Sequence, residues 1–413
     1  MGKTIIRKIT LSIFVLSLLA TSSLAISWEE ALSLAQKNNP QIKSAASQVD
    51  SARWSYYRSL SPLLPQLSAS ASLGQTASGT SAATSNSASY GLNVSQTLFA
   101  GFANYISGLS AKANLDYYDA SRQKIISDTY YTVRKSFIDL FIEDENIKLL
   151  ENILTRRKNN TELISLRYES GREDEGALLR TQADQADAAN NITSANRAKY
   201  LEKLKLTQLL SAEVNQANGT LEAIPVNISN FDVLAQNAPA SVMYNKQVEK
   251  ANLAYRKTMS EFLPSVSLAG SYRKSGSEWP PSSDSNSISL SMSYSFFPGG
   301  ANIADRATAA ADYDRARQDF VQNKNDLRYA IEAAYQAFKD AIESQRIAQL
   351  SVNAAALRSE IAHTKYMNGM VSYDEWDRIE NDYISAQKNF LSRKKSTLYA
   401  EAAWYNSYGG YVK

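Results

Sequence analysis

Cysteine is absent from this chain of 413 residues, and histidine occurs only once. Disulfide bonds are therefore impossible, and the thiolate and imidazole ligands are too few for the common structural zinc and iron–sulfur sites. The sequence also has no G-x-S-x-G motif and no glycine-rich phosphate loop, which mark many hydrolases and nucleotide sites. We therefore expect a protein that is not an enzyme and that needs no metal or other cofactor.

Long apolar runs are also missing after the first 25 residues, so we expect no helix that spans a bilayer. Residues 1–25 are organised like a secretory signal peptide: three basic residues, an apolar run over Ile9–Ala20 and a small-residue cleavage site ending at Ala25. Those three basic residues equal the whole formal charge of +3, so the chain from Ile26 onward is formally neutral. We therefore expect an exported protein that has no basic face for binding nucleic acid.

The stretch from Ser287 to Phe296 alternates strictly between serine and large apolar residues. On an extended strand, this period of two places the apolar side chains on one face and the hydroxyls on the other. The pattern suits a strand of an outer-membrane barrel, whose apolar face meets lipid and whose small polar residues line a wet lumen. The apolar positions are Ile288, Leu290, Met292, Tyr294 and Phe296.

The sequence repeats itself with an offset of about 199 residues. Matching motifs occur in the same order in both halves, which indicates one architecture with few insertions. The matched segments include Leu34–Gln36 with Leu234–Gln236, Leu64–Pro65 with Leu263–Pro264, Phe99 and Gly101 with Phe297 and Gly299, and Tyr168 and Gly171 with Tyr366 and Gly369.

Each half is expected to contain a helix, a strand pair, a long helix, a tip turn and a further helix. The helices are predicted at 28–60, 103–167, 174–210, 240–262, 303–367 and 374–406. The strands are predicted near 67–73, 90–98, 266–272 and 287–296, with a loop over 274–287. The predicted division is a signal peptide (1–25), a first repeat (26–210), a connector (211–233), a second repeat (234–404) and a C-terminal tail (405–413).

The predicted strands are long enough to cross a bilayer, but four of them cannot close a barrel of eight or more strands. Because open sheet edges are not tolerated in lipid, several protomers must share one barrel. Each long helix measures on the order of 95 Å at 1.5 Å per residue. The two shorter helices of each half roughly sum to that length and can stack end to end beside it. The pattern predicts an α+β membrane protein with four strands and four rods per protomer.

This arrangement resembles the TolC-type outer-membrane efflux proteins, or outer-membrane factors, over essentially the whole mature chain. The resemblance rests on L-P-Q-L and L-P-S-V before the first strand of each half, the corners F-A-G-F and F-P-G-G, and the tips Y-E-S-G and Y-M-N-G. It implies a homotrimer in the outer membrane of a Gram-negative-type bacterium. A shared twelve-stranded barrel would continue into a twelve-helix periplasmic barrel, with the connector and the tail at its equator.

The same resemblance implies a passive exit duct of a tripartite efflux or type I secretion system. Its partners would be a periplasmic adaptor, an inner-membrane transporter of the RND, ABC or MFS type, and outer-membrane lipid. The exported substrate is not predicted, because such a duct takes its specificity mainly from the pump.

In that family the periplasmic tip is a constriction held by tyrosine, acidic and basic side chains. When the family's motif is aligned on Gly369, Tyr366 occupies the position of its gate tyrosine. Glu375 and Arg378 occupy the two aspartate positions, and Val371 occupies the position of the arginine partner. The gate pattern is therefore altered in this chain.

Three carboxylates after this turn, Asp374, Glu375 and Asp377, can form a ring that favours cations at the narrow end. The alternative is that they are solvated charges in the first turn of a helix, where acids suit the helix dipole. The acids at Glu173–Glu175 have the same two interpretations, with the solvated one favoured. The gate candidates are Tyr366, Asp374, Glu375, Asp377 and Arg378.

Two further groups of residues have predicted roles. The tip turns expected to dock the adaptor contain Tyr168, Gly171, Tyr366 and Gly369. The corners between barrel and helices contain Pro65, Phe99, Gly101, Pro264, Phe297, Pro298 and Gly299. Aromatic residues expected at the membrane interfaces are Tyr90, Tyr272, Trp279, Tyr294, Phe296 and Phe297.

Two other functions compete with the duct. A soluble periplasmic coiled-coil adaptor or scaffold explains the long helices but gives the serine-alternating strands no purpose. A barrel enzyme such as an outer-membrane hydrolase needs a nucleophile, a base and more strands. Dependence on detergent separates the first alternative from the duct, and hydrolytic activity separates the second.

Overall fold

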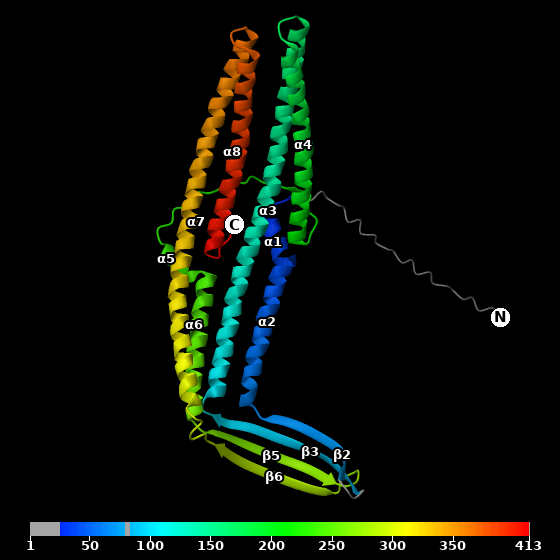
Figure 1. Cartoon of the computed structure of the whole chain (residues 1–413), viewed down its shortest axis with the longest axis vertical. Coiled ribbons are helices and arrows are strands. Elements are labelled where there is room, and N and C mark those ends of the chain that lie inside the picture. Colours follow the sequence, from blue (N-terminus) through cyan, green and yellow to red (C-terminus); the bar gives the residue numbers. More distant parts are fainter. Residues whose placement is uncertain (1–24, 79–82, 413) are drawn as a thin grey trace, which may run out of the picture.

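The computed structural model describes residues 25–78 and 83–412, so the predicted signal peptide lies outside the described residues except for Ala25. The chain forms a long bundle of helices with a four-stranded sheet set at an angle across one end (Figure 1). At the other end the helices finish in two hairpin tips. This layout separates a strand region, a middle region and a tip region along one axis.

Two helices run the length of the bundle. These are α3 (Ala103–Glu169) and α7 (Ala301–Met367), of 67 residues each, or about 100 Å at 1.5 Å per residue. Neither contains a proline, which is why neither is interrupted. Among the described residues, no helix is both long enough and apolar enough to cross a membrane.

The shorter helices stack end to end beside the long ones (Figure 1). Three of them lie along α3 and the other three along α7, which is the stacking that the predicted helix lengths indicate. Their bounds are α1 (Trp28–Asn38), α2 (Pro40–Leu60), α4 (Glu175–Leu210), α5 (Phe231–Asn237), α6 (Pro239–Lys257) and α8 (Tyr373–Ser407). Short 3-10 helices, η1 (Ser61–Leu63) and η2 (Thr258–Phe262), follow α2 and α6.

One predicted helix is divided in the structure, and one short helix occurs that the sequence did not predict. The helix predicted at 28–60 breaks at Asn39, whose side chain accepts hydrogen bonds from the amides of Gln41 (2.8 Å) and Ile42 (3.4 Å) and so caps α2. In the second half, α5 begins at Phe231, within the predicted connector, and ends before Pro239, where α6 begins close to the start of the helix predicted at 240–262. Both α2 and α6 begin with proline, which fits the first turn of a helix because it needs no donor there.

The sheet consists of β2 (Gln66–Ser78), β3 (Ala83–Ala100), β5 (Ser265–Gly276) and β6 (Ser283–Ser293), all antiparallel in the order β2-β3-β5-β6. The loop predicted over 274–287 is largely strand, because β5 is paired on both sides and its ladder continues past Arg273 and Lys274. The last predicted strand ends early, at Ser293, so Tyr294 and Phe296 lie beyond it.

The register gives the sheet one apolar and one hydroxyl-rich face. Leu92 lies opposite Ala69 and Tyr272, and Leu268 lies opposite Leu290, so these apolar side chains share a face. Residues on the other face include Ser68, Ser70, Ser72, Ser89, Ser95, Ser267, Ser271, Ser287, Ser289 and Ser291. The alternation predicted for the last strand therefore extends over all four strands.

The predicted corner residues lie where strands meet helices. Pro65 and Pro264 directly precede β2 and β5, and Phe99 lies near the end of β3. Gly101 has a positive φ of 57°, and a Cβ there would lie 2.8 Å from the Ser260 backbone, so the close turn requires glycine. In the second half, Phe297 and Pro298 follow β6, and Gly299 has a φ of 68° before α7.

Five of the six predicted interfacial aromatics divide between the two ends of the sheet, and the sixth, Tyr272, lies within β5 opposite Leu92. Tyr90 and Trp279 pack together near the outer hairpins, with ring centroids 5.7 Å apart. At the corner end, Tyr294, Phe296 and Phe297 are exposed by 53%, 88% and 81%. This separation is what two interfacial belts require.

The middle of the bundle holds the largest apolar core. It joins α1, α3, α4 and α8 through buried residues such as Phe137, Ile138 and Leu206. A short parallel pair, β1 (Ala25–Ile26) with β4 (Gln216–Ala217), ties the connector to this core. A second cluster on α7 and α8 is centred on Trp404. The connector and the C-terminal segment thus pack around the middle of the bundle.

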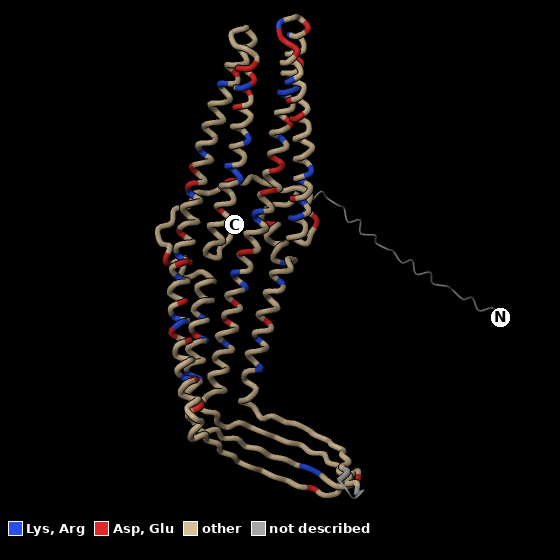
Figure 2. Tube along the Cα trace, in the orientation of Figure 1, with Lys and Arg blue, Asp and Glu red and all other residues tan. Residues whose placement is uncertain are grey.

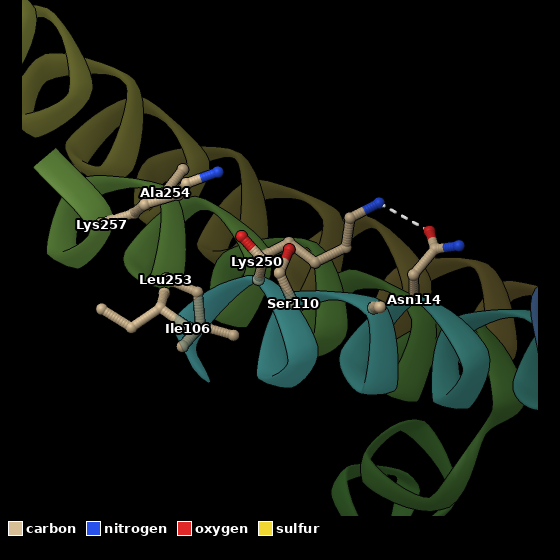
Figure 3. A pocket seen from close by; sticks show the side chains of 9 residues that line it. Ile106, Ser110, Asn114, Lys250, Leu253, Ala254 and Lys257 are labelled. Carbon is tan, nitrogen blue, oxygen red and sulfur yellow. Dashed lines mark hydrogen bonds between the residues drawn. The ribbon is translucent and has the colours of Figure 1, made fainter. Parts of the chain in front are cut away.

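A hollow of about 430 Å³ lies between α3 and α6 near the sheet (Figure 3). Ile106 and Leu253 form its apolar floor, and at its edge the Lys250 ammonium donates to the Asn114 amide oxygen at 2.8 Å. It is roughly 80 Å along α3 from the hairpin tips at 1.5 Å per residue. The hollow is therefore separate from the tip region described next.

Candidate functional site at the hairpin tips

The two hairpin tips have the same backbone turn. Gly171 and Gly369 adopt φ values of 70° and 72°. The amide of Gly171 donates to the carbonyl of Tyr168 at 2.9 Å, and that of Gly369 to the carbonyl of Tyr366 at 3.0 Å. A second bond, from the residue after each glycine back to the last turn of the long helix, closes the motif at 2.8 and 2.9 Å. The glycines let each chain reverse tightly between antiparallel helices.

Tyr366 is buried between the two hairpins, with 1% of its surface exposed. Its hydroxyl donates to the Glu173 carboxylate at 2.6 Å, and Glu173 belongs to the other hairpin. Arg167, at the end of α3, lies over the Tyr366 ring at 4.3 Å and donates to its carbonyl at 3.3 Å. On the other side, Trp376 stacks on Tyr366 with ring centroids 4.7 Å apart. Tyr366 is thus held by both hairpins at once.

The environment of Tyr366 keeps its hydroxyl protonated. Burial, followed by the hydrogen bond to Glu173, raises the pKa of Tyr366 to about 12. The hydroxyl therefore remains a hydrogen-bond donor to the carboxylate throughout the physiological pH range.

A buried carboxylate below this tyrosine joins α8 to α3. Glu380 is 2% exposed and accepts two hydrogen bonds from Arg156, at 2.5 and 2.6 Å, and one from Ser359 at 2.7 Å. Burial alone would raise the pKa of Glu380, but the hydrogen bonds from Arg156 and Ser359 outweigh it and hold the pKa below its ordinary value of 4.5. The ionised form of Glu380 is therefore favoured by the fold.

A second buried acid, Asp377, is bound by arginines from the first hairpin. Arg157 of α3 contacts it at 3.2 Å and Arg180 of α4 at 3.1 Å. Arg157 also contacts Asp184 at 3.4 Å and donates to the side chain of Asn381. The interface between the hairpins is thus held by a network of ion pairs as well as by Tyr366.

The predicted gate residues therefore have different positions. Asp374, Glu375 and Arg378 are exposed on the first turns of α8. Asp377 is 4% exposed and paired with Arg157 and Arg180 of its own chain. The Asp377 carboxylate is therefore enclosed by arginines and is not exposed together with those of Asp374 and Glu375. Asp377 is two residues from Glu375, so these two side chains do not share a face of α8, and the Asp377 carboxylate contacts Arg157 and Arg180 instead.

The predicted docking residues also differ in how far they are exposed. Gly171 and Gly369 lie at the ends of the tips, and a Cβ at either position would meet nothing within 4 Å. Tyr168 is 39% exposed on the first tip. Tyr366, assigned to docking as well as to the gate, faces the interior between the hairpins and leaves no side-chain surface for a partner.

Sequence reasoning missed the partners of these residues. Arg156, Arg157 and Arg167 are charged residues on a long helix, and in sequence they look like any solvated charge. One signal was available: Trp376, Glu380 and Ile384 recur at four-residue spacing on α8, which places an acid on an apolar stripe. An acid on a buried stripe implies a basic partner on the adjacent helix.

The comparisons with known proteins agree with this architecture. The sequence profile of a family described as "Outer membrane efflux protein" matches residues 31–212 and 231–410, which are the two copies of the internal repeat. A curated relative, the proteases secretion protein PrtF of Dickeya chrysanthemi, is 21% identical over 96% of this chain and 90% of its own length.

Two solved structures are similar to the whole chain. The Campylobacter jejuni CmeC outer membrane channel superposes with a TM-score of 0.81 at 18% identity, over 93% of this chain and 86% of its own. The Vibrio cholerae outer membrane protein VceC superposes with a TM-score of 0.80 at 16% identity, over 94% of this chain and 97% of its own. These likenesses concern the fold of the protomer.

Proposed function

This chain belongs to the outer membrane efflux protein family, and from that premise we propose that its hairpin tips form the periplasmic gate of a trimeric duct. The protein is an outer-membrane exit duct for efflux or secretion that extends into the periplasm. Family membership favours this function over a soluble adaptor or scaffold. Family membership also favours a transport protein over the outer-membrane hydrolase considered above.

The open edges of the sheet support the trimer. β2 and β6 are edge strands, and each presents unpaired backbone groups. In a bilayer such groups must find partners, so the β2 edge of one protomer pairs with the β6 edge of the next. Three protomers supply twelve strands, which lies within the range of closed barrels. The apolar face then meets outer-membrane lipid and the serine face lines the lumen.

Partners at the tips complete the proposed assembly. Proteins of this family work with periplasmic adaptors and inner-membrane pumps. For this chain we assign adaptor docking to the exposed ends of the tips, around Tyr168, Gly171 and Gly369, and a transporter of the RND, ABC or MFS type beneath the adaptor. The likeness to PrtF, which is named for the secretion of proteases, supports protein cargo alongside small-molecule efflux.

The observation that carries the gate proposal is the burial of Tyr366 between the hairpins, with its hydroxyl 2.6 Å from Glu173. Opening the duct requires the α7/α8 hairpin to move relative to the α3/α4 hairpin. That movement breaks the hydrogen bond to Glu173 and exposes the Tyr366–Trp376 stack. The resting duct is therefore closed, and engagement of the adaptor supplies the free energy that opens it.

The exposed acids at the start of α8 have a separate role in this proposal. Three copies of Asp374 and Glu375 form a ring of six carboxylates at the narrow end, where a low-dielectric wall strengthens their field. Cations then pass more readily than anions through the partly open tip.

Purification of the protein in detergent, mass determination and single-channel recording test the proposed duct. The expected result is a trimer with a small, cation-preferring conductance that rises several-fold in Glu173→Ala, which removes the acceptor of the Tyr366 hydroxyl. Replacing Asp374 and Glu375 by the corresponding amides should reduce the preference for cations and leave the protein trimeric. A protein that is monomeric, or that gives no conductance in any variant, contradicts the proposal.

A further inference from the structure

Charged residues are almost absent from the sheet (Figure 2). Within its four strands, as far as the structure describes them, they are Arg273, Lys274 and Asp284. Lys274 and Asp284 lie directly opposite each other on the face that carries the apolar side chains. Arg273, one residue earlier, is therefore on the other face. It is the single charge of the serine face among the described strand residues.

The surroundings of Arg273 do not neutralise it. Its register neighbours on the adjacent strands are Gly91 and Ser285, which carry no charge. Its guanidinium donates to the Ser89 hydroxyl at 2.9 Å, and Ser89 is hydrogen-bonded in turn to Ser72 at 2.8 Å. Hydroxyl groups orient a guanidinium but leave its positive charge in place.

Gly91 keeps the path of this side chain clear. A Cβ on Gly91 would lie 2.6 Å from the Tyr272 carbonyl and 3.4 Å from the Arg273 Cβ. The bare backbone lets the Arg273 side chain cross β3 toward Ser89 instead of projecting freely. The position of the charge is thus fixed by the sheet itself.

Arg273 lies three residues from the end of β5 at Gly276, or about 10 Å from the outer hairpin at 3.3 Å per residue. This is the level of Tyr90 and Lys274, which lie opposite each other in the register. If the serine face lines the lumen, as the proposed function requires, three copies of Arg273 encircle the outer mouth of the pore.

We propose that Arg273 determines charge selectivity at the outer mouth, where its three copies form a positive ring that attracts anions and disfavours cations. This proposal rests on the proposed trimeric duct. The ligand class is small anions and cargo bearing carboxylate, phosphate or sulfonate groups. The outer mouth then has the opposite charge preference from the acidic tip some 100 Å or more away along the duct.

The absence of cysteine allows a direct test of this potential. Ser285→Cys places a thiol directly opposite Arg273 on the serine face. This variant is reconstituted in lipid vesicles and treated with membrane-impermeant thiol reagents, one anionic and one cationic. The ratio of anionic to cationic labelling rates at Ser285→Cys should fall at least five-fold when Arg273→Gln is added, and should change little with Arg273→Lys.

Lys274→Gln serves as the matched control, because it removes an adjacent positive charge from the opposite face. It should leave the labelling ratio at Ser285→Cys within two-fold of its starting value. The effect of Arg273 should also shrink at 1 M salt, where screening shortens to about 3 Å.

Three results would overturn the proposal. A ratio that is unchanged by Arg273→Gln shows that Arg273 sets no potential there. A ratio that follows Lys274→Gln instead shows that the two faces are assigned the wrong way round. Failure of the wild-type chain to form trimers in the same preparation would contradict the proposed duct. Mass determination distinguishes this result from the first two results.

Discussion

Residues 166–172 and 364–370 reverse the chain in the same way at the two hairpin tips. The glycine φ values differ by two degrees and the matching hydrogen bonds by about 0.1 Å. The helix that follows is capped in both cases by a side chain, Asp174 in one and Ser372 in the other. The duplication has therefore preserved the backbone of the tip.

The side chains at these tips have diverged. Tyr168 is 39% exposed, whereas its copy Tyr366 is 1% exposed and bonded to Glu173. The position that corresponds to Glu173 in the second hairpin, 198 residues later, is Val371. Tyr168 and Val371 cannot form the reverse hydrogen bond. The first tip also carries charges and the second carries none over 367–371 (Figure 2).

Under the proposed function, this difference gives the two copies of one repeated unit different roles. The shared backbone gives both hairpins the same narrow end, which docking requires. The lock between hairpins depends instead on residues that occur once. Variants made in matched pairs across the repeat can therefore separate the shape of the tip from its closure.

The largest expected effect is at Trp376, whose copy in the first hairpin is Leu178. Trp376 is 2% exposed and stacks on Tyr366, so Trp376→Ala should destabilise the closed tip by about 3–5 kcal/mol. Leu178 is only partly buried, so Leu178→Ala should cost roughly 1–2 kcal/mol. The free energy of local opening, measured by amide exchange at the tips, checks both values. Equal losses would contradict the asymmetry.

A smaller effect is expected at Glu380, whose copy is the exposed Gln182. Removing the charge in Glu380→Gln should cost roughly 1–3 kcal/mol, below the value for a fully buried pair because solvent screens the partly exposed Arg156. Gln182→Ala, made in parallel, should change the opening free energy by less than about 0.5 kcal/mol.

The Glu380 pair also predicts a pH dependence. Since the fold lowers the pKa of Glu380, its stabilisation is present above the ordinary pKa of 4.5 and is lost as the pH falls through the lower value in the folded protein. Tip opening measured between pH 7 and pH 3 should therefore rise in the wild type. In Glu380→Gln the rise should be smaller, and an equal rise would assign the acid sensitivity to other groups.

The smallest effect, and the one expected to be symmetric, is at the turn glycines. Both have a positive φ and open space around the Cβ position, so Gly171→Ala and Gly369→Ala should each cost about 1 kcal/mol through backbone strain alone. Thermal or denaturant unfolding followed at each tip measures the two costs. A difference above about 1 kcal/mol would mean that the two turns are not equivalent.

The parts of the fold that repeat were predictable from the sequence. The alternation beginning at Ser287 predicted a strand, and the corner glycines predicted the turns between strands and helices. Both predictions were possible because strand periodicity and positive-φ turns are local properties. The lengths of α3 and α7 followed from the lack of proline. The break at Asn39 was missed, although an Asn-Pro pair is a common start signal for a helix.

The network between the hairpins was not predictable in the same way. Arg157 and Asp377 are separated by 220 residues, and nothing local distinguishes them from solvated charges. The run of acids after Gly369 drew attention to Asp377 as a member of a carboxylate ring, but it did not indicate the arginine partners. Only the packing of α8 against α3 and α4 shows that this carboxylate is enclosed by arginines.

The most direct test of the account compares Tyr366→Phe with Tyr168→Phe in single-channel recordings of the reconstituted trimer. Each variant removes one hydroxyl from the same position of the repeat. We predict a several-fold larger conductance for Tyr366→Phe, because its bond to Glu173 is lost, and a conductance equal to wild type for Tyr168→Phe. Equal conductance in both variants would contradict the claim that Tyr366 closes the duct.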